Sequence, residues 1–251
     1  MAPTLIVAHW ESRKADGFRR LHFLALGKIE DRGVGNSPEG ECVMSASPPS
    51  YQPDPKAALR RLVLGRRKTV HAEKGVGAAE SVARRVLEEV RAAQKRVAGY
   101  WPIGDELDPR PALQAVVDAG GEAALPVVAG QGQVLIFRQW KCGDPLDPGP
   151  FGTAHPNPRA PAVMPDILLL PLIAYDKTGH RLGYGAGYYD RTVQALRAQR
   201  DIVVIGLAYD EQEIDAVPAG SHDQRLDAVI TDRRAVWFDP AAQSRAQLIQ
   251  K

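Results

Sequence analysis

An alternation of predicted strands and helices after residue 54 constrains the fold most strongly. Hydrophobic periodicity predicts helices over residues 54–70, 78–96, 109–120 and 189–200. It predicts strands over residues 96–101, 122–128, 134–140, 166–176, 201–210 and 226–232. This alternation is typical of an α/β domain with a largely parallel sheet, and such sheets bind ligands beyond the carboxyl ends of their strands.

Local signals support several of these elements. Asp54 is suited to cap the first helix and Pro55 to occupy its first turn. Gly120 and Gly121 are expected to stop the third helix. Residues 166–176 form an apolar run that predicts one fully buried strand, and residues 226–232 are predicted as the last strand.

Residues 1–53 differ from the rest of the chain. Much of this segment is rich in Gly, Ser, Pro and charge without a sustained period, which predicts a poorly ordered extension. We therefore divide the chain into this extension, a catalytic domain over 54–239 and a tail over 240–251. Met44 precedes a short polar leader, so we expect residues 1–43 to be dispensable, and untranslated if Met44 is the true start.

Composition excludes several classes of protein. The 251 residues carry a formal net charge of +2, which is too small to indicate a nucleic-acid scaffold. Cys42 and Cys142 form no disulfide framework, and no signal peptide or membrane span is predicted. We expect a cytoplasmic monomer that binds small molecules and neither nucleic acid nor membrane.

Residues 179–191, GHRLGYGAGYYDR, place a glycine loop between a buried strand and a helix. Glycine lets a ligand approach the main chain, and successive N–H groups before a helix bind anions. The spacing matches neither a Walker loop nor a dinucleotide fingerprint, so a structural turn remains an alternative. Arg181 can fork onto phosphate oxygens, and Asp190 is suited either to bind magnesium or to begin the helix.

At this loop the chain resembles a known family. The segment LPLIAYDKTGHRLGYGAGYYDR is similar to the signature of the 5-formyltetrahydrofolate cyclo-ligase family. KAALR, YWPIGDELD and VPAGSHDQRLDAVIT resemble three further motifs of that family, in order, between about Lys56 and Asp232. The resemblance implies a single three-layer α/β domain of the NagB/RpiA/CoA-transferase-like fold.

The resemblance also implies an activity. Enzymes of this family use Mg-ATP to convert 5-formyltetrahydrofolate to 5,10-methenyltetrahydrofolate, and they release ADP and phosphate. Phosphorylation of the formyl oxygen makes it a good leaving group, and N10 of the folate then closes the ring. The cofactor implied is Mg²⁺, with ATP as co-substrate. Such a protein must align the γ-phosphate with the formyl oxygen and neutralise charge.

Site residues follow from the matched motifs. Arg181 and Tyr188 are the expected catalytic residues, and Asp190 and Asp223 the expected metal ligands. The expected ATP-binding residues are Lys56, Arg60, Arg181, Leu182, Gly183, Tyr184, Gly185, Ala186, Gly187, Tyr188 and Tyr189. The expected folate-binding residues are Trp101, Glu106, Tyr184, Gly185, Ala186, Gly187 and Tyr188.

Sequence alone leaves a plainer alternative for several of these residues. Lys56 and Arg60 also fit a solvated basic helix face, because Arg61, Arg66, Arg67 and Lys68 are nearby. Asp223 also fits a turn and Trp101 a core position. Tyr188 and Tyr189 cannot be separated, since one can line the folate pocket while the other packs inward.

The loop GTAHP at residues 152–156 departs from the family's usual Gly-Ile-Pro-Glu-Pro. His155 stands in place of a carboxylate, or is an ordinary exposed loop histidine. The departure motivates a second hypothesis, an ATP-binding paralogue with altered or lost cyclo-ligase activity. A third hypothesis is a phosphate-ligand sensor with a nucleic-acid-binding N-terminus, which the absence of a helix-turn-helix pattern in residues 1–53 argues against.

Overall fold

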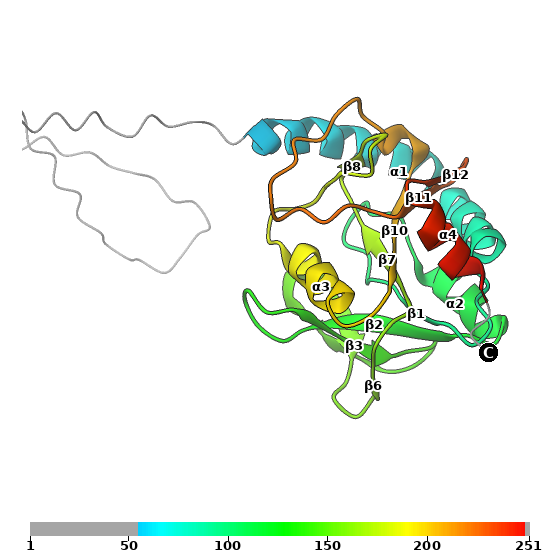
Figure 1. The fold of residues 1–251 in the computed structure, drawn as a ribbon. Helices are drawn as coiled ribbons and strands as arrows, with labels where there is room; N and C mark the ends of the chain where they lie inside the picture. The colour runs from blue at the N-terminus through cyan, green and yellow to red at the C-terminus, as the bar shows by residue number, and fades with distance from the viewer. Residues whose placement is uncertain (1–54, 249–251) are drawn as a thin grey trace, which may run out of the picture. The chain divides into compact units, whose positions relative to one another are not determined.

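Helix α1 (Pro55–Glu89) begins the part of the chain that the computed structural model describes, residues 55–248 (Figure 1). The prediction of two helices, 54–70 and 78–96, is wrong, because one helix of 35 residues runs through both segments. Gly75 and Gly77 lie inside it. A glycine costs only about 1 kcal/mol relative to alanine in a helix, and apolar packing by Val70 and Val82 on either side offsets that cost.

An eight-stranded sheet forms the centre of the domain. Its order is β12-β11-β10-β7-β1-β2-β3-β6. The five strands from β11 to β2 are parallel, whereas β12, β3 and β6 pair antiparallel at the edges. The strands are β1 (Arg96–Ala98), β2 (Glu122–Val128), β3 (Leu135–Gln139), β6 (Ala162–Val163), β7 (Ile167–Pro171), β10 (Val203–Ala208), β11 (Ala228–Thr231) and β12 (Ala235–Trp237). The predicted α/β domain with a largely parallel sheet is confirmed.

Helices cover both faces of this sheet (Figure 1). On one face, α1, α2 (Arg110–Asp118) and α4 (Pro240–Gln247) pack on an apolar cluster that includes Leu169 of β7. On the other face, α3 (Tyr188–Arg197) packs on a cluster that includes Leu168 and Leu170. Successive residues of a strand point to opposite faces, so the continuous apolar run in β7 follows from burial on both sides.

The segment 166–176 is two strands and not the predicted one. β7 ends at Pro171, and β8 (Ala174–Tyr175) pairs with β9 (Arg181–Leu182) in a separate hairpin. The buried Gln212 side chain donates hydrogen bonds of 2.9 Å to the Leu172 carbonyl and 3.0 Å to the Ile173 carbonyl. These bonds satisfy the peptide groups where the chain leaves the sheet, as burial requires.

Shorter elements complete the described chain. β4 (Leu146–Pro148), the 3₁₀ turn η1 (Pro150–Gly152) and β5 (Ala154–Pro156) lie between β3 and β6, and β4 pairs antiparallel with β5. A second 3₁₀ turn, η2, spans Asp210–Gln212. β11 is not the last strand, because β12 follows it antiparallel.

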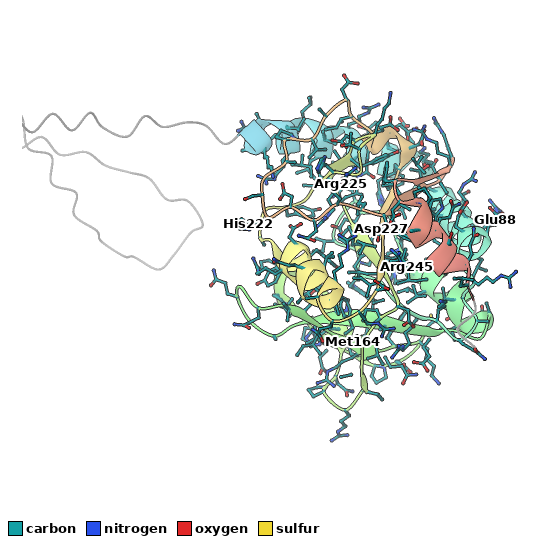
Figure 2. The ribbon with its side chains drawn as sticks, in the orientation of Figure 1. Glu88, Met164, His222, Arg225, Asp227 and Arg245 are labelled. Atoms are coloured by element: carbon teal, nitrogen blue, oxygen red, sulfur yellow. The ribbon has the colours of Figure 1, made fainter. Side chains whose placement is uncertain are left out.

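The C-terminal part of the domain is tied to the sheet by polar and apolar contacts. Helix α4 lies within the predicted tail, and its Ala242 and Ala246 are fully buried. Asp227, labelled in Figure 2, accepts a hydrogen bond of 2.7 Å from the Val204 amide and pairs with Arg197 of α3 at 2.8 Å.

Several expectations fall outside residues 55–248. They concern the extension over 1–53, a start at Met44, Cys42 and a nucleic-acid-binding N-terminus. Within the described residues, Cys142 is exposed and free. No helix in this range is long and apolar enough to cross a membrane.

Candidate functional site

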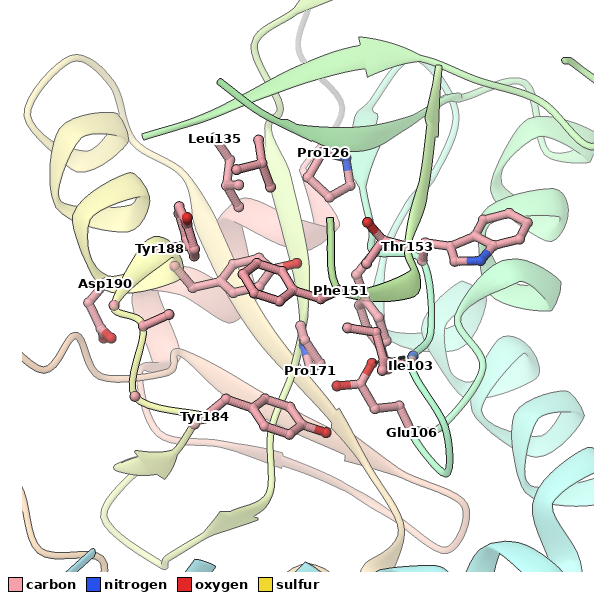
Figure 3. Close-up of a pocket in the computed structure, with 18 of the residues that line it drawn as sticks. Ile103, Glu106, Pro126, Leu135, Phe151, Thr153, Pro171, Tyr184, Tyr188 and Asp190 are labelled. Carbon is pink, nitrogen blue, oxygen red and sulfur yellow. Dashed lines mark hydrogen bonds between the residues drawn. The ribbon is translucent and has the colours of Figure 1, made fainter. Parts of the chain in front are cut away.

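A cavity of about 330 Å³ opens at the carboxyl ends of β1, β2 and β7 (Figure 3). Pro126 and Val128 come from β2, Pro171 ends β7, and Trp101 and Ile103 follow β1. The other lining residues are Tyr100, Glu106, Leu135, Phe151, Thr153, Ala154, Arg181, Gly183, Tyr184, Gly185, Ala186, Gly187, Tyr188, Tyr189 and Asp190. The lining is mainly apolar and aromatic with a few polar groups, as in most sites for small molecules.

The glycine loop forms one wall of the cavity. Gly185 has φ +97° and Gly187 has φ +68°, which other residues rarely adopt. A Cβ atom at Gly185 would stand 3.2 Å from the Arg60 guanidinium. Gly187 is the N-cap of α3, so the glycine loop ends where this helix begins.

Helix α1 brings the N-terminal motif to this loop. The Arg60 Nε donates a hydrogen bond of 2.9 Å to the Gly183 carbonyl. The Lys56 Nζ lies 2.6 Å from Asp223 Oδ2. The sequence separates these last two residues by 167 positions, yet the fold joins them. Both cations thus make specific contacts, whereas the neighbouring Arg61, Arg66 and Lys68 are exposed.

Arg181 and Asp190 form the polar corner of the cavity. The Arg181 Nη2 lies 2.6 Å from Asp190 Oδ1, and its Nη1 donates to the Gln224 carbonyl. Asp190 also accepts a hydrogen bond of 3.0 Å from the Gln224 amide. Burial lowers the pKa of the Arg181 guanidinium. A buried guanidinium beside an open cavity is suited to bind phosphate oxygens.

Of the two predicted metal ligands, Asp190 lies in the first turn of α3 and Asp223 in the loop before β11, and the Gln224 amide next to Asp223 donates to Asp190. The hydrogen bonds of Asp190 fall on Oδ1, and those of Asp223, from Lys56 and the Gly220 amide, fall on Oδ2. The second oxygen of each carboxylate is the candidate ligand. Residues 55–248 contain no group of three or more His, Cys, Asp or Glu side chains that could hold a metal. The donor set fits a magnesium ion that takes its remaining ligands from phosphate and water.

Glu106 and Trp101 lie on the opposite side of the cavity, after β1. Glu106 is 3% exposed, and its Oε2 accepts a hydrogen bond of 2.8 Å from the Ile103 amide. Burial raises the pKa of the Glu106 carboxyl. The Trp101 ring lines the cavity and lies 4.8 Å from the Arg110 guanidinium. A flat ring and a carboxylate at one end of the cavity can hold a heterocycle that carries N–H groups.

The tyrosines after the glycine loop both reach the cavity. Tyr188 lines it and lies under the Arg191 guanidinium at 5.4 Å. Tyr189 lines it as well and packs against both apolar clusters, and burial raises the pKa of its hydroxyl. Leu182 is different, because its side chain is buried against Val63 of α1. Only the main chain of Leu182 remains for a ligand.

Sequence reasoning missed several residues of the site. Tyr100 and Phe151 line the cavity, and Phe151 has a left-handed φ of +61°. The basic neighbourhood of Arg67 predicts a solvated side chain, but Arg67 is only 2% exposed and pairs with Asp105 at 3.0 Å. One signal was available, because Arg67 follows Arg60 by seven residues and therefore lies on the same helix face.

The GTAHP loop borders the cavity through Thr153 and Ala154. His155 does not line it. This residue lies half-buried in β5, and its Nδ1 is 3.1 Å from the Pro156 carbonyl oxygen. The departure from the family motif therefore alters the border of the cavity mainly through its neighbours.

Comparison with known families gives one match over most of the chain. The model of the 5-formyltetrahydrofolate cyclo-ligase family matches residues 53–232. A 5-formyltetrahydrofolate cyclo-ligase of Mycolicibacterium smegmatis is 31% identical over 192 residues, 73% of this chain and 97% of the relative. One from Escherichia coli is 33% identical over 149 residues, 56% of this chain and 79% of the relative.

Solved structures show the same architecture. The 5,10-methenyltetrahydrofolate synthetase of Aquifex aeolicus has a TM-score of 0.61 and 29% identity, and the match covers 73% of this chain and 92% of that one. The synthetase of Mycoplasma pneumoniae has a TM-score of 0.56 and 24% identity, over 71% of this chain and 99% of that one. The second likeness concerns the fold alone.

Proposed function

The chain belongs to the 5-formyltetrahydrofolate cyclo-ligase family, and from that premise we propose how its site divides between two substrates. The enzyme converts 5-formyltetrahydrofolate to 5,10-methenyltetrahydrofolate with ATP. The aromatic cavity holds the folate, and the cationic side of the glycine loop holds the triphosphate. The observation that supports this division is the loop itself, which lines the cavity through Gly183 and Gly185. It accepts a hydrogen bond from Arg60 at Gly183, and at Gly185 it leaves little room for a Cβ atom beside the Arg60 guanidinium.

The reaction needs two groups brought into line. The formyl oxygen on N5 attacks the γ-phosphorus of ATP, the bond to the bridging oxygen breaks, and ADP leaves. N10 then adds to the activated formyl carbon and loses its proton. Phosphate departs with the former formyl oxygen. Amide resonance makes the formyl carbon a poor electrophile before phosphorylation, so alignment and charge neutralisation carry the catalysis.

The folate side supplies orientation. The Glu106 carboxylate accepts hydrogen bonds from the amino and ring N–H groups of the pterin. Trp101 stacks on a flat ring, as do the tyrosines of the loop. Tyr188 lines the same cavity as Arg181. These contacts place N5 and its formyl group toward the glycine loop.

The phosphate side supplies charge. Arg181 binds the oxygens of the transferred phosphoryl group, while Lys56 and Arg60 bind the remaining phosphates. The amides of residues 183–189 approach the same oxygens, because two of the glycines carry no Cβ atom in a left-handed backbone. Mg²⁺, when bound, neutralises phosphate charge, and Asp190 and Asp223 would hold it.

Further properties belong to the same proposal. We infer that the enzyme is a cytoplasmic monomer that binds neither nucleic acid nor membrane. We also infer that its fold is a variant of the NagB/RpiA/CoA-transferase-like architecture, which helices on both faces of a mainly parallel sheet support. The division into an extension, a catalytic domain over 54–239 and a tail remains a prediction.

Formation of the methenyl chromophore tests the function directly. Purified full-length chain with 5-formyltetrahydrofolate and Mg-ATP should produce the chromophore, with one ADP per product. Mixtures that lack ATP should produce none. ATP hydrolysis or binding without any chromophore would support the ATP-binding paralogue instead, which the comparisons do not favour.

A further inference from the structure

Arg67 is a buried arginine at the edge of the cavity without a role so far. Its guanidinium donates to both carboxylate oxygens of Asp105, at 3.2 and 3.0 Å. It also donates to the Tyr184 hydroxyl at 2.7 Å and to the Leu172 carbonyl at 3.3 Å. Only 2% of the residue is exposed. Burial alone would lower the pKa of Arg67, but its bonds to Asp105 and Tyr184 raise it, so it stays charged.

The partners of Arg67 belong to the two walls that the proposed function assigns to folate. Asp105 precedes Glu106 on the loop after β1, and Tyr184 lies in the glycine loop. Figure 3 shows the Tyr184 and Glu106 side chains pointing toward one another. The Tyr184 ring is half-exposed, so packing alone does not fix it. The oxygen of the Tyr184 hydroxyl accepts a hydrogen bond from Arg67. The hydroxyl hydrogen therefore remains available to an acceptor on the side of Glu106.

Arg60 and Arg67 hold successive residues of the glycine loop from one face of α1. Arg60 binds the carbonyl of Gly183, and Arg67 binds the side chain of Tyr184. Seven residues separate the two arginines, which is two helical turns. The same rigid helix therefore fixes the loop backbone and the orientation of its first aromatic side chain.

We propose that Arg67 is a positioning residue for folate: it holds the Tyr184 hydroxyl and the 105–106 loop in the one arrangement that presents Glu106 to the pterin. This inference rests on the proposed function for the identity of the ligand. A purely structural arginine would need only the Asp105 pair to tie α1 to the domain. The bond from Arg67 to the half-exposed Tyr184 at the cavity wall is not needed to attach α1 to the domain.

The charge around Glu106 gives the proposal a pH signature. Burial raises the pKa of Glu106, whereas Arg67 and the Tyr184 hydroxyl pull it down. The titratable groups that face it are Arg67 on α1, Asp105 beside it, Tyr100 after β1, Tyr184 on the glycine loop and Tyr189 on α3. Removal of the Tyr184 hydroxyl therefore raises the pKa of Glu106 further, and the carboxylate is lost at a higher pH.

Two variants and a matched control test the proposal. Arg67→Lys keeps the charge but cannot bind Asp105 and Tyr184 together. Tyr184→Phe keeps the ring and removes the hydroxyl at an exposed position, so the fold should be preserved. Each should raise the KM for 5-formyltetrahydrofolate about tenfold, the expected effect of losing one hydrogen bond to a charged group. The KM for ATP should change less than about twofold, because neither substitution removes a group that the proposed function assigns to the ATP phosphates. Arg66→Lys, at an exposed site on the same helix, should match the parent.

The double variant and the pH profile separate positioning from general damage. In the double variant the two losses should be smaller than the product of the single losses, because Arg67→Lys and Tyr184→Phe break one shared bond and only the contact with Asp105 is left to lose. The acid limb of kcat/KM for folate should move to higher pH in Tyr184→Phe. An unchanged folate KM in Arg67→Lys, or losses that multiply in the double variant, would overturn the proposal. If the parent forms no chromophore, the proposed function fails, and folate affinity by intrinsic fluorescence still tests Arg67.

Discussion

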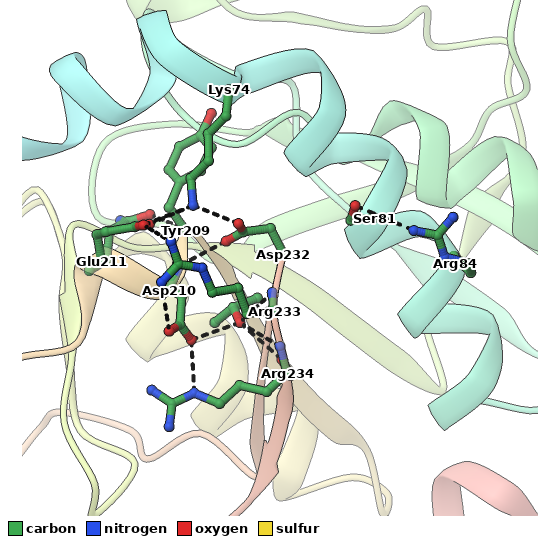
Figure 4. Close-up of polar contacts among 11 residues, drawn as sticks. Lys74, Ser81, Arg84, Tyr209, Asp210, Glu211, Asp232, Arg233 and Arg234 are labelled. Atoms are coloured by element: carbon green, nitrogen blue, oxygen red, sulfur yellow. Dashed lines mark hydrogen bonds and ion pairs between the residues drawn. The ribbon is translucent and has the colours of Figure 1, made fainter.

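Two polar clusters lie against helix α1, and they behave differently. One is the cavity cluster of Arg67, Glu106, Arg181, Asp190 and the glycine loop. The other, the Lys74 network, joins Lys74, Asp210, Glu211, Asp232, Arg233 and Arg234 beyond the ends of β10 and β11 (Figure 4). Both gather charge at the carboxyl edge of the same sheet.

The charges of the Lys74 network neutralise one another. Lys74 lies 2.6 Å from Asp232 and 2.8 Å from Glu211, and Arg234 lies 2.8 Å from Asp210. None of its members lines the cavity. In the cavity cluster, by contrast, Arg181 and Glu106 are buried and border open space. Charged residues at strand ends therefore indicate a binding site only where they face a cavity. Charged residues that pair with one another, as in the Lys74 network, contribute to stability.

The largest expected effect is the loss of Arg181. Arg181→Ala removes a buried cation from the proposed phosphate side, and ATP-dependent turnover should fall about tenfold to a hundredfold. Steady-state ADP release measures the loss. Arg234→Ala, the matched change in the Lys74 network, should leave the kinetics unchanged. Equal losses in both variants would remove the distinction between the clusters.

A smaller effect is expected at Asp190. Asp190→Asn keeps the shape but removes a charge from the proposed magnesium site, so turnover should fall about tenfold and half-maximal activity should need more magnesium. Titration of activity with magnesium tests this. Asp210→Asn is the control in the Lys74 network. If Asp190→Asn titrates with magnesium like the parent, Asp190 only begins the helix.

Glu106→Gln should affect one substrate more than the other. Its KM for folate should rise several-fold, while that for ATP stays within about twofold, since a neutral amide accepts a weaker hydrogen bond. In the proposed folate site the ionised carboxylate is the binding form, and burial raises the pKa of Glu106 above the ordinary 4.5. In the parent, kcat/KM for folate should therefore fall with decreasing pH from above 4.5. This limb should disappear in Glu106→Gln and persist in Glu211→Gln.

The smallest effect is expected in the Lys74 network, and it concerns stability. Lys74→Met should lower the free energy of unfolding by about 1 kcal/mol, as partly exposed ion pairs contribute little. Burial would raise the pKa of Asp232, but the bond from Lys74 holds it below the ordinary value. This stabilisation is present at neutral pH and is lost as pH falls through the lowered pKa. Denaturant titrations at neutral and acid pH measure it, and a changed folate KM would contradict it.

Local patterns of sequence determined the class of the fold and one half of the site. Strand and helix periods predicted the α/β domain, because they depend on neighbouring residues alone. The glycine loop and the motif residues Arg181 and Asp190 were found because their spacing is local. The fold then placed Lys56 and Arg60 beside them, as the ordered motifs implied.

Tertiary structure alone decided the rest. The continuity of α1 through Gly75 depends on a core that packs on both sides of the glycine. The division of residues 166–176 depends on Gln212, which satisfies the carbonyls where the strand leaves the sheet. The spacing of seven residues from Arg60 places Arg67 on the same helix face, but it does not show that Arg67 is buried, because burial of a guanidinium depends on partners distant in sequence. Asp105 and Tyr184 meet Arg67 across 38 and 117 positions, and no local pattern encodes that meeting.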